Sequence, residues 1–155
     1  MTLAATSYQW FLAGHILAAV VWVGGAVTLH LLFHRVNPEE DPARAALLMG
    51  EAGFIGNRVL APAAVVLLIL GFVLMGKGDW DYDLWVLFAL AVWLYSLVVG
   101  AGYFGRKAGP LAEGLATQGW TPEVAAIWRP FRRLAAIETW LLVLAVVDMV
   151  LKPGA

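Results

Sequence analysis

The chain has 155 residues, a length that suits one domain. Hydrophobic residues make up 62% of it and charged residues 14%, against about 45–50% and about 25% in soluble domains. This composition excludes a disordered chain, a nucleic-acid-binding module and an ordinary cytosolic enzyme, because a soluble fold of this size cannot hide so much apolar surface. The net charge of −1 offers no basic surface to nucleic acid, and the absence of cysteine excludes disulfides and iron–sulfur clusters. The sequence therefore predicts an integral membrane protein.

Four apolar stretches are long enough to cross a bilayer, which takes about 20 residues. We place these spans approximately at residues 9–34, 58–76, 84–105 and 133–152. Each must be helical, because backbone groups in lipid have no water to hydrogen-bond. We expect one all-α membrane domain, a four-helix antiparallel bundle in up-down-up-down order, with the first span beside the fourth.

Two of the connecting segments carry signals for the start of a helix. Asp41 and Thr121 each precede a proline, and a capping side chain followed by proline is typical of a first helical turn. We expect a short helix from Asp41 toward the second span, broken near Gly53 and Gly56. In loop three, we expect a short amphipathic helix that lies on the membrane surface and leads into the fourth span.

The basic residues are shared unevenly between the two sides of the predicted bundle. Eight of the ten flank loops one and three, and only Lys77 and Lys152 lie on the other side. The positive-inside rule then places loops one and three in the cytoplasm and both termini outside.

All three histidines lie on the first span or at its end. An imidazole inside a membrane span is costly without a partner or ligand, so His15 and His30 are functional candidates. These two are about 22 Å apart along a helix, so they cannot bind one ion from the same helix. His30 and His34 have the i, i+4 spacing of metal ligands, although His34 also suits an exposed interfacial position.

Two acids of the fourth span lie at depths that match two of the histidines. Glu138 matches His30 near the inner end, and Asp148 matches His15 in the outer half. A carboxylate that holds the distal imidazole N–H is a partner suited to a metal-bound histidine, and the same pairing suits proton relay. Two alternatives stay open: His15 hydrogen-bonds a backbone carbonyl of a neighbouring helix, and the acids extend to the membrane interfaces.

One face of the first span leaves space beside His15. At 100° per residue, His15 shares this face with Ala19, Trp22, Ala26 and Phe33, and the two alanines leave room for a flat ligand such as a porphyrin. A second face is made of small residues and suits close helix packing. It consists of Gly14, Ala18 and Gly25.

Three stretches of the sequence resemble known bacterial membrane families. FLAGHILAAVVWVGG (Phe11 to Gly25) resembles the first span of the HemJ-type protoporphyrinogen oxidases and of the CopD-type copper-resistance proteins, in which a histidine precedes a Trp-small-Gly turn. FRRLAAIETWLLVLAVVDMVLKP (Phe131 to Pro153) is similar to the last HemJ span, with its Arg-rich entry, buried acid and terminal Lys-Pro. NRVLAPAAVVLLILGFVLMG resembles the second span of a related, uncharacterised four-helix family. The resemblance implies a multi-pass protein of the bacterial inner membrane.

In the HemJ family the first-span histidine is a haem b ligand, a role that the resemblance carries over to His15. That family's third-span lysine has no counterpart here, so the resemblance implies haem binding without implying the oxidase activity. We expect a haem b-binding protein with a redox or porphyrin-related role, as a homodimer or in a respiratory assembly, and whether it is an enzyme is left open. The second axial position is vacant, Met149, or a residue of another copy or subunit. The rival interpretations are a CopD-like copper or other metal protein that uses His30, His34 and Glu138, and a non-catalytic assembly subunit.

Overall fold

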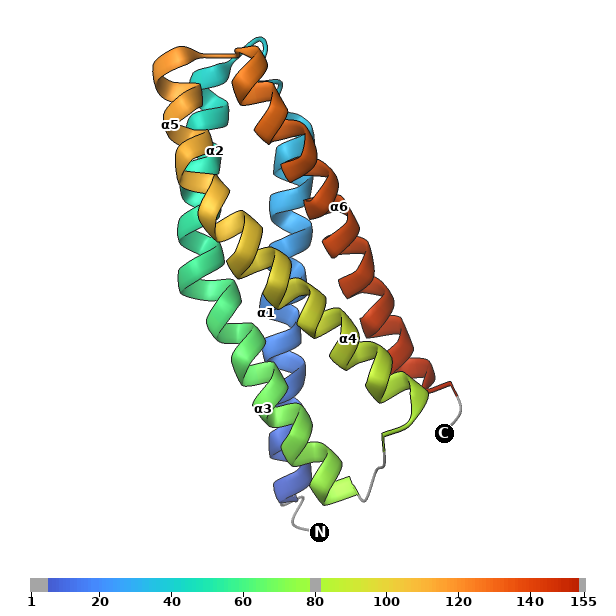
Figure 1. The fold of residues 1–155 in the computed structure, drawn as a ribbon. Helices are drawn as coiled ribbons and strands as arrows, with labels where there is room; N and C mark the ends of the chain where they lie inside the picture. The colour runs from blue at the N-terminus through green and yellow to red at the C-terminus, as the bar shows by residue number, and fades with distance from the viewer. Residues whose placement is uncertain (1–5, 79–81, 154–155) are drawn as a thin grey trace.

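The computed structural model describes residues 6–78 and 82–153, and within these ranges its regular elements are all helical. Four long helices run antiparallel to one another (Figure 1). Two of them are composite and contain π-helical segments, labelled η. In chain order, the elements are α1 (Ser7–Arg35), α2 (Pro42–Ile55), η1 (Gly56–Leu60), α3 (Ala61–Gly78), α4 (Leu84–Val99), η2 (Gly100–Phe104), α5 (Gly105–Gln118) and α6 (Pro122–Leu151).

Each of the four long helices is apolar and long enough to cross a membrane. The predicted four-span, all-α bundle is therefore confirmed. Both predicted helix starts are also confirmed, because Asp41 accepts a hydrogen bond from the backbone N–H of Arg44 at 2.9 Å and Thr121 accepts one from Val124 at 3.3 Å. α1 also packs against α6, as predicted for the first and fourth spans.

The second and third long helices extend further than predicted. The helix that starts at Pro42 is not broken at Gly53 or Gly56 but continues through η1 to Gly78. In the same way α4 continues through η2 into α5, and α6 is one helix that includes the segment expected to lie separately on the membrane surface. A π-helical turn keeps the backbone hydrogen-bonded while it widens the helix, which is why the glycines do not end it.

The most deeply buried part of the core lies where α2, α5, the end of α1 and the start of α6 meet, at the upper end of Figure 1. Met49 and Leu111 have no exposed surface there. The ring of Phe33 meets Trp128 and Phe131 edge-on, with centroids 6.3 and 5.9 Å apart. The amphipathic segments of loops one and three therefore pack against each other and extend the bundle beyond the predicted spans.

α1 and α3 approach closely along the predicted face of small residues. A Cβ on Gly14 would lie 3.1 Å from Leu70 of α3, and one on Gly25 would overlap the side chain of Leu60, the last residue of η1. Ala18, between the two glycines, is buried. Membrane helices associate through such close backbone approach because burial from lipid supplies little driving force, so this prediction of close packing is confirmed.

Leucine at position 25 should separate α1 from the second long helix at η1, whereas leucine at position 24 should not. A Cβ on Gly24 meets nothing within 4 Å, which makes Gly24→Leu the matched control for Gly25→Leu. We expect Gly25→Leu to lower the free energy of unfolding by about 1–3 kcal/mol relative to Gly24→Leu, because it overfills the contact with Leu60. Unfolding of the detergent-solubilised protein by SDS measures the difference, and equal values for the two variants would contradict the close packing.

Candidate functional site

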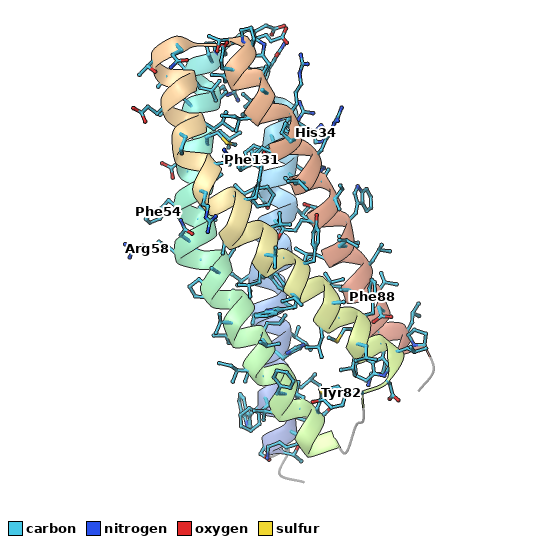
Figure 2. The ribbon with its side chains drawn as sticks, in the orientation of Figure 1. His34, Phe54, Arg58, Tyr82, Phe88 and Phe131 are labelled. Atoms are coloured by element: carbon cyan, nitrogen blue, oxygen red, sulfur yellow. The ribbon has the colours of Figure 1, made fainter. Side chains whose placement is uncertain are left out.

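A central cavity of about 220 Å³ lies where the two π-helical segments face α1 and α6. Each segment begins with a glycine, and π-helical turns within longer helices are frequent at functional sites. The wall of the central cavity is largely apolar. Its aromatic members are Trp22, Phe33, Trp93, Phe104 and Phe131. Figure 2 shows Phe131 among the helices, whereas Arg58 points away from the bundle.

The central cavity opens between the second and third long helices. The lining residues Ala61 and Val65 on α3 are exposed, and so are Leu97 on α4 and Ala101 on η2, which lie across the opening from them. These positions lie inside helices that are apolar enough to cross a membrane. The opening therefore lies at a level of the bundle that is suited to contact with lipid.

The polar wall of the central cavity is formed chiefly by α4 and α6. Ser96 is only 4% exposed, and its hydroxyl has no hydrogen-bond partner. The Glu138 carboxyl lies beside this hydroxyl, although the geometry of the two groups does not complete a hydrogen bond. Thr139 donates its own hydroxyl to Ala135 at 2.8 Å and is thereby satisfied. An acid and a hydroxyl that lie side by side in a largely apolar cavity are costly and suit ligand binding.

His30 lines the same cavity as Glu138, without a hydrogen bond between them in the described part of the chain. Its ring meets that of His34 edge-on, with centroids 4.6 Å apart, and Arg132 donates to Nδ1 of His34 at 3.4 Å. The guanidinium disfavours a metal cation at this pair by charge repulsion. No three His, Asp or Glu side chains among residues 6–78 and 82–153 are close enough to hold a metal ion together. The structure thus does not bring His30, His34 and Glu138 together as a metal site.

His15 is half-buried and faces α3. Its Nδ1 lies 3.0 Å from the carbonyl oxygen of Leu67, and its Cε1 lies where a Cβ on Gly71 would be 3.4 Å away. Because a carbonyl only accepts hydrogen bonds, a neutral His15 ring carries its hydrogen on Nδ1 and keeps the lone pair of Nε2. His15 therefore has the tautomer of a metal ligand, and it lies outside the central cavity.

The predicted partnership of His15 with Asp148 is absent from the described side-chain contacts. The carbonyl of Leu67 takes the role proposed for Asp148, whose Oδ2 is buried without a hydrogen-bond partner. The packing of the bundle explains this difference. The face of α1 that carries His15 is turned toward α3, whereas α6 packs against α4 as well as α1. Met149, the other proposed contributor from α6, is half-buried beside Asp148 in the chain.

The residues of α1 that were predicted to share one face with His15 lie in two different surroundings in the structure. Trp22 and Ala26 line the central cavity, whereas Ala19 lies one turn nearer to His15 and is half-buried outside it. Neither the central cavity nor a role for Ser96 was predicted from the sequence. A lone serine in an otherwise apolar span, four residues before Gly100, is the signal that points to them.

Comparison of the chain with models of protein families, with curated proteins and with solved structures gives no match. A function for this chain therefore has to rest on the geometry of His15 and of the central cavity.

Replacing the Glu138 carboxyl with an amide should stabilise the protein when no ligand is bound. A carboxylate without a basic partner costs more to bury than a neutral amide of the same shape, so we expect Glu138→Gln to raise the free energy of unfolding by about 1–3 kcal/mol. Glu113→Gln on α5 removes an exposed carboxylate and should change it by less than about 0.5 kcal/mol. SDS unfolding of both variants measures this, and an unchanged or lower stability of Glu138→Gln would show that the carboxyl has a partner.

Proposed function

We propose that the chain is a multi-pass protein of the bacterial inner membrane that binds haem b, with His15 as an axial ligand. The observation that carries this proposal is the hydrogen bond between Nδ1 of His15 and the carbonyl of Leu67. A metal-bound imidazole usually donates its other N–H to such a group, which fixes the ring and leaves Nε2 for the iron. The resemblance of the first span to haem-binding HemJ proteins supports the same residue.

The Nε2 lone pair of His15 is suited to bind haem iron, whereas the central cavity is too small for the haem itself. At about 220 Å³, the cavity is not far above the ~150 Å³ that holds one benzene ring, and His15 is not among its lining residues. We therefore assign the haem to the outer half of α1, beside Ala19, and not to the central cavity. Met149 or a residue of a second copy is the candidate for the other axial position. A redox or haem-related role, in a homodimer or a respiratory assembly, is part of this proposal.

His15→Ala should abolish or shift the Soret band of the purified protein, because it removes the proposed iron ligand. His30→Ala is the matched control, since it removes another imidazole of α1 and should leave the band unchanged. His15→Gln separates the two roles of the residue, because an amide side chain keeps a donor for Leu67 but is a poor haem ligand. Absorption spectra of the oxidised and reduced proteins, after expression with added haem, provide the measurement.

A wild-type protein without any chromophore would defeat the haem proposal, and so would a Soret band that survives His15→Ala unchanged. Metal analysis of the same preparation tests the copper interpretation. Copper that is lost in His30→Ala and retained in His15→Ala would favour the pair His30 and His34 instead.

The same proposal places both termini outside the cytoplasm, because eight of the ten basic residues flank the predicted loops one and three. Reporter fusions after Gly119, between α5 and α6, and after Ala155 test this orientation. We expect cytoplasmic activity from the first fusion and external activity from the second. The reverse pattern would invert the orientation, and the same side for both would contradict the four-span arrangement.

A further inference from the structure

We propose that the central cavity binds the positively charged head group of a lipophilic ammonium compound, with Glu138 as its counter-ion and Ser96 beside it. This ligand would be separate from the haem, since His15 lies outside the central cavity. The proposal rests on the charge, the aromatic lining, the size and the opening of the cavity.

The Glu138 carboxylate has no positively charged partner within the described part of the chain. Ser96 is the group beside its carboxyl, and no basic side chain of these ranges pairs with it. Of the two arginines that precede Glu138 on α6, Arg132 is directed to His34, and Arg133 is exposed. A buried carboxylate needs an opposite charge to offset its lost hydration, and here that charge can be supplied by a ligand.

The aromatic lining is suited to a cation rather than to a second anion. Trp93 donates its indole N–H to the carbonyl of Ala64 at 2.9 Å, which fixes the ring at the wall of the cavity. Trp22 contributes a second indole, and Phe104 and Phe131 contribute phenyl rings. Ring faces attract ammonium groups, most strongly where water is excluded.

The size and the opening of the cavity limit the rest of the ligand. A volume of about 220 Å³ accepts a trimethylammonium group or a single ring but not a larger ring system. The opening beside Ala61 and Leu97 lies within membrane-spanning helices, so an apolar tail can remain in the bilayer while the head group reaches Glu138. The chemical class is therefore an amphiphilic amine or quaternary ammonium ion.

Binding of phenyltrimethylammonium to the full-length protein in detergent, measured by equilibrium dialysis, tests the proposal. Benzenesulfonate has a similar size and the opposite charge, and it should not bind. We expect Glu138→Gln to weaken binding of the cation by about tenfold or more, because it removes the counter-charge. Glu113→Gln removes an exposed carboxylate of α5 and should bind like the wild type.

A second variant tests the site without changing its charge. Ala61→Trp fills the opening of the cavity and should also weaken binding of phenyltrimethylammonium. Any one of three outcomes would overturn the proposal. These are equal affinity of wild type and Glu138→Gln for the cation, comparable binding of benzenesulfonate, and no binding of the cation to wild type. The Soret band of Glu138→Gln should equal that of wild type, so failure here and failure of the haem proposal are distinguishable.

Discussion

The close packing of α1 on α3 determines the position of every candidate group on the first helix. Gly14 and Gly25 let the two backbones approach, and the contact fixes the rotation of α1 about its own axis. With α1 in that rotation, His15 meets the carbonyl of Leu67, while Trp22 and Ala26 line the central cavity. A single packing face therefore controls both the proposed haem ligand and one wall of the proposed cation site.

The two ends of the bundle meet different physical demands. Around Met49 and Leu111, four helices bury a continuous apolar and aromatic core, as a soluble helical bundle does. Further along, large apolar side chains such as Val66 and Leu94 are exposed, which is the normal state of residues that face lipid. The central cavity lies near the junction of these two environments, where neither the apolar core nor the lipid fills the space between the helices.

The sequence was sufficient for features that depend on local chemistry. Apolar length predicted the four spans, Asp41 and Thr121 predicted two helix starts, and the small residues predicted a close helix contact. Features that depend on the backbone of a distant segment were out of reach. The partner of His15 is a main-chain carbonyl, which any residue at position 67 would supply. Matching depths along two helices suggested Asp148 instead, because depth alone carries no information about which face each helix turns inward.

The π-helical segments carry a consequence for the register of the long helices. An extra residue in one turn rotates everything beyond it by about 100° relative to a regular α-helix. α2 packs against α5, whereas α3, its continuation past η1, packs against α1, so one helix must present two differently oriented faces. The added residue in η1 helps to set the angle between them. A one-residue deletion in this segment would therefore turn half of a helix as a unit, so insertions and deletions here should be far less tolerated than substitutions.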